Sequence, residues 1–338
     1  MFSTLLTIPT EVEALPAEVV CLVLGWLPKD MVGVAARTCR RWFACCPPEA
    51  RRKLYARRAC SSATLLLWAL AQGYPLHHAS TCAAAAGQGQ LGVLRWARAQ
   101  GCPWDSRTCH QAARNGHLAV LKWVFGQGLQ PFHERRVCRA AAKHLEVLQW
   151  ARGVGYEWDK LVCFYAALHG RLDVLRWAHA HGCPWDATTC AAAAENGHLP
   201  VLQWARSVGC PWDERTSYSA ARQGHLGVLQ WARENGCEWE EWTCALAAEH
   251  GHLEVLRWAR ENGCPWDERT SYQAAKNGQL EVLKWAHQHG CTWDAYTWRA
   301  AQQWPEIKQY ALQHGCPQEE GEEEETVWSR CSYSAWKR

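Results

Sequence analysis

A repeat of 27 residues constrains the fold of this chain more than any other feature of its sequence. The repeat keeps one phase over more than two hundred of the 338 residues and is marked by Gly101, Gly128, Gly155, Gly182, Gly209, Gly236, Gly263 and Gly290. A looser copy begins 28 residues earlier, at Gly73, and a typical unit, residues 209–235, reads GCPWDERTSYSAARQGHLGVLQWAREN. Nine units of one pattern predict a solenoid of stacked units rather than a two-lobed enzyme.

Each unit has the pattern of a helix–turn–helix. Asp213 suits the N-cap of a first helix, because its carboxylate can accept hydrogen bonds from backbone N–H groups near Thr216. This helix ends in the small pair Ala220–Ala221, and Gly224 breaks it. A second helix then presents a broad apolar face made of Leu226, Val228, Leu229 and Trp231. Gly236 is expected to close this helix in the left-handed conformation. Because one unit cannot bury its apolar face alone, neighbouring units must stack on it.

The repeat also explains the high content of Trp and Cys, with 23 and 19 residues. We expect a second-helix Trp in the core of each unit, at Trp68, Trp96, Trp123, Trp150, Trp177, Trp204, Trp231, Trp258 and Trp285. A further Trp follows the closing Gly, at Trp104, Trp158, Trp185, Trp212, Trp239, Trp266 and Trp293. Six cysteines directly follow this Gly, where an apolar side chain packs back on the helix: Cys102, Cys183, Cys210, Cys237, Cys264 and Cys291.

The cysteine spacing predicts neither disulfides nor a metal site. Equivalent cysteines of adjacent units should lie roughly 8–10 Å apart, the spacing of packed helices. This exceeds the reach of a disulfide, about 7 Å between Cα atoms. The sequence also contains no C-x-x-C pair, so a zinc site is not indicated.

The core of the unit, A-A-x-x-G-H-L-x-V-L-x-W-A-x-x-x-G, resembles an ankyrin repeat over residues 64–316. Two features differ from the family pattern: the period is 27 instead of about 33, and W-D-x-x-T replaces the T-P-L-H start. The missing residues fall where ankyrin units carry a β-hairpin finger, so the finger should be reduced to a tight turn. Short, Trp-rich ankyrin units of this kind resemble those of large DNA viruses and some protists, which implies host–virus interaction.

A different pattern precedes the repeats, in the segment ALPAEVVCLVLGWLPKDM at residues 14–31, followed by Thr38-Cys39-Arg40 and Trp42. It resembles an F-box, whose pattern is L-P-x-E-φ-φ-x-x-φ-φ-x-x-L-x-x-x-D-φ and then V-C-[KR]-x-W. Only Thr38 departs visibly from this pattern. The resemblance implies docking onto a Skp-type adaptor of a cullin–RING ubiquitin ligase, through Leu15, Pro16, Glu18, Val19, Val23, Leu27 and Met31. The alternative is a plain helical cap on the first repeat.

These patterns predict an all-α chain in four parts. Residues 1–13 form a flexible N-terminus, residues 14–55 the F-box-like domain, residues 56–316 about nine ankyrin-like units, and residues 317–338 an acidic, disordered tail. The last unit is degenerate, because Lys308 stands where earlier units have Leu. A polar residue at that position is typical of a terminal capping repeat.

No pattern in the sequence indicates an enzyme or a cofactor. The run Gly87–Gly92 spells G-x-G-x-x-G, but it follows a predicted helix instead of a strand, so we do not interpret it as a dinucleotide site. The histidines of the G-H-L motif recur with the turn and are interpreted as helix-start residues. The N-terminus lacks a charged n-region and cleavage site, and no uncharged stretch is a membrane span. Many cysteines without a secretion signal favour the cytoplasm or nucleus, or the host cytoplasm for a viral protein.

We therefore expect a protein–protein interaction module, most simply the substrate receptor of an SCF-type ubiquitin ligase. Target contacts should use positions that differ between units: Arg107, His110, Phe164, Tyr165, Arg215, Tyr218, Trp242, Leu246, Arg269, Tyr272 and Arg299. A binding scaffold without a ligase role is the alternative. A nucleic-acid binder using the basic connector Arg51, Arg52, Lys53, Arg57 and Arg58 has the weakest support, because the net charge is only +3.

Overall fold

The computed structural model describes residues 79–129 and 135–318. The predicted F-box-like domain, its adaptor-binding residues, the basic connector and the acidic tail lie outside these residues. Every regular element within the described ranges is a helix and none is a strand, which confirms the expected all-α class with shortened fingers. No helix in these ranges is long and apolar enough to cross a lipid bilayer.

The chain divides into two compact units, residues 1–162 and 163–338, with the boundary inside one helix. The described part of the N-terminal unit comprises α6 (Ala79–Gly87), α7 (Leu91–Ala99), α8 (Ser106–Arg114), α9 (Leu118–Gly126), α10 (Arg136–Ala140), the 3₁₀-helix η2 (Ala141–Lys143) and α11 (Leu145–Gly153). The boundary helix is α12 (Lys160–Leu168).

The C-terminal unit continues the same helix pairs as far as residue 318. It comprises α13 (Leu172–Ala180), α14 (Ala187–Glu195), α15 (Leu199–Ser207), α16 (Glu214–Arg222), α17 (Leu226–Glu234), α18 (Glu241–Glu249), α19 (Leu253–Glu261), α20 (Glu268–Lys276), α21 (Leu280–Gln288), α22 (Ala295–Ala301) and α23 (Pro305–Gln313).

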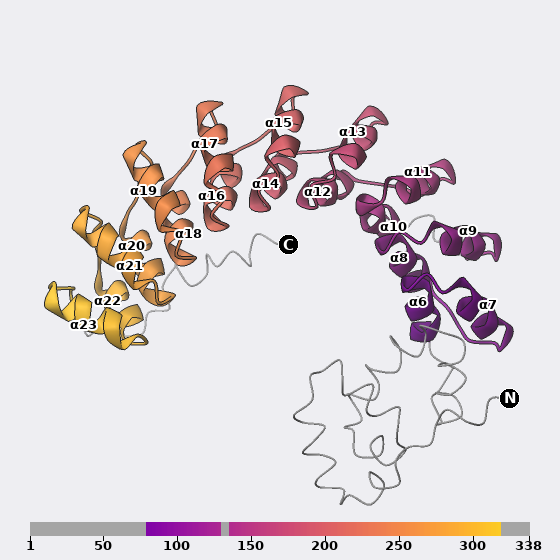
Figure 1. The fold of residues 1–338 in the computed structure, drawn as a ribbon, viewed down its shortest axis with the longest axis horizontal. Helices are drawn as coiled ribbons and strands as arrows, with labels where there is room; N and C mark the ends of the chain where they lie inside the picture. The colour runs from indigo at the N-terminus through magenta and orange to yellow at the C-terminus, as the bar shows by residue number, and fades with distance from the viewer. Residues whose placement is uncertain (1–78, 130–134, 319–338) are drawn as a thin grey trace, which may run out of the picture. The chain divides into compact units, whose positions relative to one another are not determined.

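The pairs of the C-terminal unit form two layers of helices (Figure 1). The first helices α14, α16, α18, α20 and α22 pack side by side in one layer. The residues at their contacts are small: paired alanines such as Ala220 and Ala221 are completely buried. The second helices α15, α17, α19, α21 and α23 form the other layer. The first four bury Val and Leu side chains, whereas α23 buries Ile307.

The caps of most pairs follow the sequence prediction, although the N-cap residues Glu240 of α18 and Arg135 of α10 make no side-chain capping hydrogen bond. The backbone N–H of Arg215 donates a hydrogen bond to Asp213 Oδ1 at 3.2 Å, which starts α16. Gly236 has a φ of +82°, and the N–H of the next residue, Cys237, donates to the carbonyl of Ala232 at 2.9 Å. This 6→1 hydrogen bond is the Schellman closure expected where a glycine ends a helix.

The recurring histidines connect each pair to the one before it. His117 Nε2 lies 3.2 Å from the carbonyl oxygen of Gly87, thirty residues earlier. A Cβ built on Gly224 would lie only 2.7 Å from Nδ1 of His252, so the ring packs directly on this glycine. The histidines stand at helix starts as predicted, but they make no capping hydrogen bond. Their contacts are with the preceding pair, which the sequence analysis did not foresee.

The second-helix tryptophans from Trp96 to Trp285 lie at the edge of the core rather than inside it, so their predicted placement was wrong, and Trp68 lies outside the described residues. Val228, Leu229 and Ala232 of α17 are almost completely buried, whereas Trp231 is half-buried. Its ring meets the turn tryptophan Trp212 edge to face, with ring centroids 5.9 Å apart. The same contact recurs in Trp104–Trp123, Trp185–Trp204, Trp239–Trp258 and Trp266–Trp285. Small aliphatic side chains fill the core, and the large rings cover its rim.

The last described pair has the polar surface predicted for a terminal cap. Lys308 in α23 is exposed, whereas Leu283, at the equivalent position of α21, is completely buried. Ile307 remains buried, with 1% of its surface exposed, because it faces α22 and not a further unit. Trp304 takes the place of the histidine and donates from Nε1 to the carbonyl of Lys276 at 3.2 Å.

Candidate target-binding surface

Some positions of the first helices hold different residues in different units, whereas others hold the same residue in most units. In α14 to α22, a completely buried threonine such as Thr216 stands three residues after each N-cap. Positions two and five residues after the cap are mostly partly exposed and hold residues of many kinds. In α14 to α22 these positions are Thr188, Ala191, Arg215, Tyr218, Trp242, Ala245, Arg269, Tyr272, Tyr296 and Arg299, here called the first-helix row. A row that is mostly partly exposed and that varies from unit to unit is typical of a surface that recognises a partner.

The structure brings three of the predicted target-binding residues together and separates the others. Trp242, Arg269 and Tyr272 line one pocket of the C-terminal unit. Arg299 is exposed but does not line it. Leu246 has only 6% of its surface exposed, so it packs between helices, and its predicted role as a target contact is corrected.

The remaining predicted residues lie at other places on the first helices. Arg107 is exposed at the start of α8 and forms an ion pair with its own N-cap, Asp105, at 2.7 Å. His110 lies one turn further along the same helix and is partly buried. Phe164 and Tyr165 of α12 meet edge to face, with ring centroids 5.3 Å apart. Arg215 and Tyr218 belong to α16, three pairs away from Tyr296 in α22.

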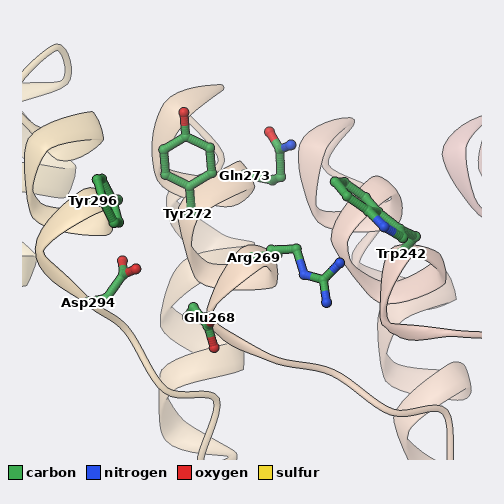
Figure 2. A pocket seen from close by; sticks show the side chains of 7 residues that line it. All are labelled: Trp242, Glu268, Arg269, Tyr272, Gln273, Asp294 and Tyr296. Atoms are coloured by element: carbon green, nitrogen blue, oxygen red, sulfur yellow. The ribbon is translucent and has the colours of Figure 1, made fainter. Parts of the chain in front are cut away.

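The pocket is formed by neighbouring first helices (Figure 2). Its walls are Trp242 from α18, Glu268, Arg269, Tyr272 and Gln273 from α20, and Asp294 and Tyr296 at the start of α22. It encloses about 430 Å³ of space that is partly open to solvent. Sequence reasoning missed four of these residues. Asp294 stands at the N-cap position that the sequence analysis described for Asp213, and Tyr296 occupies the same row position as Arg269, so both could have been found by alignment of the units.

Arg269 is fixed in place by the residue that caps its own helix. Its Nε donates to Asp267 Oδ2 at 2.6 Å, and its backbone N–H donates to Oδ1 of the same carboxylate at 3.1 Å. The held guanidinium lies over the Trp242 ring, 5.0 Å from the centroid. Arg215 repeats the arrangement with Asp213, and this hydrogen bond raises the pKa of Arg215 above its ordinary value. These arginines are therefore rigid, permanently charged parts of the surface.

The two carboxylates of the pocket have no cation of their own. In the described ranges, neither Glu268 nor Asp294 forms an ion pair. Asp294 Oδ1 accepts hydrogen bonds from the backbone N–H and the hydroxyl of Thr297, at 2.9 and 3.0 Å. No described residue donates to its Oδ2, so this oxygen can accept a hydrogen bond from a ligand. Lys276, at the C-terminal end of α20, lies over the ring of Tyr272, with its ammonium nitrogen 5.4 Å from the ring centroid. The pocket thus combines aromatic rings, carboxylates and hydrogen-bond donors.

The cysteines follow packing geometry. Those in the described ranges are free and buried. Cys237 Sγ donates to the carbonyl oxygen of Asp213 at 3.4 Å and accepts from Ser217 Oγ at 3.3 Å. Burial raises the pKa of the Cys237 and Cys291 thiols, so both stay protonated at neutral pH. No group of three His, Cys, Asp or Glu side chains among residues 79–129 and 135–318 is arranged to hold a metal ion.

The stacked helix pairs define a helical repeat protein. Comparison with known families assigns its two modules: ankyrin repeats (many copies) match residues 163–206 and 244–287, and an F-box-like pattern matches residues 12–57. The chain therefore carries an F-box-like domain followed by ankyrin repeats, and it is a protein–protein interaction module. Proteins built from these modules are typically non-enzymatic adaptors. No curated protein is significantly similar to the chain.

Proposed function

We propose that this protein is the substrate receptor of an SCF-type ubiquitin ligase. The F-box-like match at residues 12–57 supports docking onto a Skp-type adaptor, since that is the role of an F-box. The repeats supply the second half of a receptor, a rigid surface for a target protein. The proposal rests on the combination of two features in one chain. One is the F-box-like match, and the other is a stack of repeats whose first-helix row is mostly partly exposed.

The target is bound by the first-helix row, centred on the pocket of Trp242, Arg269 and Tyr272. Aromatic and arginine side chains contribute most to protein–protein affinity, because they bury a large area with little loss of side-chain entropy. Arg269 is already immobilised by Asp267, so binding orders few additional groups.

Adaptor docking is tested by replacing Leu15 and Pro16 with Ala in the full chain. In the F-box pattern both residues lie at the extreme start, where they contribute little to the core of a small helical unit. The double variant should lose co-purification with a Skp-type adaptor and keep the helical circular dichroism of the repeats, whose units mainly contact their neighbours. Replacing Leu5 and Leu6, which precede the F-box-like match, is the matched control. If the wild-type chain binds no adaptor, the ligase role fails and a binding scaffold remains.

Target capture is tested on the row itself. Proteins recovered with the wild-type chain should be lost when Trp242 and Tyr272 are replaced by Ala, yet retained by the Leu15/Pro16 variant. Gln203→Ala, at an exposed position of a second helix, is the control for the opposite layer. Recovery that is insensitive to the row variants and lost with Gln203→Ala would place the target surface on the second helices and contradict the assignment to the row.

A further inference from the structure

The pocket of the C-terminal unit already places cations on its aromatic rings, with one exception. The Arg269 guanidinium lies 5.0 Å from the Trp242 ring centroid, and the Lys276 ammonium lies 5.4 Å from that of Tyr272. Tyr296, with 37% of its surface exposed, has no cation over its ring among the described residues. A ring face of this kind attracts a cation through its quadrupole.

Two carboxylates belong to the same pocket as this ring. Glu268 and Asp294 line the pocket and form no ion pair within the described ranges, and in Figure 2 Asp294 lies below Tyr296 and Glu268 below Tyr272. Arg269 contributes little net charge, because Asp267 neutralises it at 2.5 Å. Arg299 stands one turn further along α22, outside the pocket, and is exposed. The pocket is therefore lined by aromatic rings and by the two carboxylates.

The charge of the whole C-terminal unit points in the same direction. Residues 163–318 hold thirteen Lys and Arg against seventeen Asp and Glu, an excess of four negative charges. The described ranges of the N-terminal unit hold eleven against four, an excess of seven positive charges. The mild charge of the full chain thus conceals an acidic unit that favours a basic partner segment over an acidic one.

We infer that this pocket takes the side chain of an arginine from an extended segment of the target protein. The inference rests on the proposed function, since it assigns the ligand class of the same surface. A planar guanidinium stacks on the Tyr296 ring and donates hydrogen bonds to Glu268 and to Oδ2 of Asp294. Lysine fits less well, because its compact ammonium lacks the flat face and the forked donors.

Two segments of this chain are alternative occupants. The acidic run Glu322–Glu325 would bring like charge to Glu268 and Asp294, which disfavours it. The basic run at residues 51–58 of a second copy has the right charge, and its binding would make the purified protein self-associate. Concentration-dependent self-association that Tyr296→Ala abolishes would overturn the assignment to a partner protein.

The test begins with a peptide library selected on the purified full-length chain. We expect arginine to be enriched at one fixed position of the selected peptides. Affinity is then measured by fluorescence polarisation for the best peptide and for its citrulline analogue, which keeps the shape of arginine but lacks its charge. The exchange should weaken binding about tenfold, the equivalent of one cation–π contact with a charge-assisted hydrogen bond.

Variants with matched controls locate the arginine. Tyr296→Ala and Glu268→Gln should each reduce the affinity ratio of the arginine and citrulline peptides to about two. Thr188→Ala and Glu214→Gln change the equivalent positions of α14 and α16, outside the pocket, and should leave the ratio unchanged. Arg299→Gln should tighten the arginine peptide about twofold by removing a like charge, a gain that loss of structure does not produce. Circular dichroism checks the fold of each variant.

The outcomes separate this inference from the proposed function. A selection that yields no binder, no fixed arginine, or an arginine whose citrulline analogue binds equally well overturns the inference. If such peptides still compete with the captured target and depend on Trp242, the row remains the target-binding surface. If no variant of the row affects target capture, the proposed function of this surface fails as well.

Discussion

At the scale of single residues, the buried threonine of the first helix shows how a repeat can retain an imperfect contact. Thr108, Thr189, Thr216, Thr243 and Thr270 are completely buried, and their hydroxyl groups have no hydrogen-bond partner. Thr297 differs, because its hydroxyl donates to Asp294 Oδ1 at 3.0 Å. A hydroxyl removed from water without a partner destabilises the folded state.

Thr216→Val should therefore increase the free energy of unfolding by about 1 kcal/mol, because it replaces an unpaired hydroxyl by a methyl group of similar size. Thr297→Val is the matched control and should decrease it by about 1 kcal/mol, because it removes a hydrogen bond. Urea denaturation of both proteins measures the two values. Destabilisation of similar size in both variants would show that the Thr216 hydroxyl has a partner.

The half-burial of Trp231 changes what its removal should cost. Truncation of a fully buried Trp to Ala lowers the free energy of unfolding by about 3–5 kcal/mol. Because the ring lies at the edge of the core, against Trp212, we expect Trp231→Ala to lower the free energy of unfolding by about 2 kcal/mol. Glu234→Ala, at an exposed position of the same helix, should stay within about 0.5 kcal/mol of the wild type. If Trp231→Ala lowers the free energy of unfolding by less than about 1 kcal/mol, the ring behaves as a surface side chain and the contact with Trp212 does not stabilise the fold.

At the scale of helices, the histidine contacts make stacking sensitive to pH. Burial lowers the pKa of His252, and the nearby His250 and His225 act in the same direction, against the opposing effect of the Arg222 carbonyl. The folded state then binds fewer protons than the unfolded state. Stability should rise with pH through the unfolded pKa of about 6.5 and be lost as pH falls below it.

His252→Gln should weaken this dependence, because Gln279 already fills the equivalent place against Gly251 without a titratable group. Thermal unfolding would be followed between about pH 5.5 and about pH 7.5, around the ordinary pKa of histidine. The decrease in melting temperature towards acid should be smaller in the variant. His289→Gln is the control: this exposed side chain binds the Trp285 carbonyl of its own helix. Equal pH dependence in wild type and His252→Gln would exclude His252 as a contributor.

Helix types and boundaries could be predicted from the sequence because local signals coincide in most of the described units. Asp213 caps, Gly236 has positive φ, and the apolar period selects Val228 and Leu229 for burial. The contacts between units could not be predicted in the same way, since a repeat spacing does not specify how one pair lies on the next. The same limitation explains the errors at Leu246 and at the tryptophans, which depend on the distance between neighbouring pairs.

At the scale of the whole molecule, the repeat predicts that complete units can be removed. Deleting residues 213–239 joins Trp212 to Glu240, the N-cap of α18, and so leaves every remaining pair complete. The shortened protein should remain helical, with a smaller dependence of unfolding free energy on urea concentration, because less surface is exposed on unfolding. Deleting residues 213–225 removes only the first helix and should unfold the neighbouring pairs. Equal behaviour of both deletions would contradict a modular stack.

The sequence by itself determined the architecture of this protein: an all-α stack of 27-residue pairs with a polar last unit, preceded by an F-box-like segment. These properties are carried by local signals that repeat, so neighbouring residues suffice to specify them. Only the tertiary structure decided which variable residues meet. Tyr296 and Asp294 lie more than twenty residues from Arg269 and more than fifty from Trp242 in sequence, and they share a pocket because adjacent first helices pack closely through their alanines.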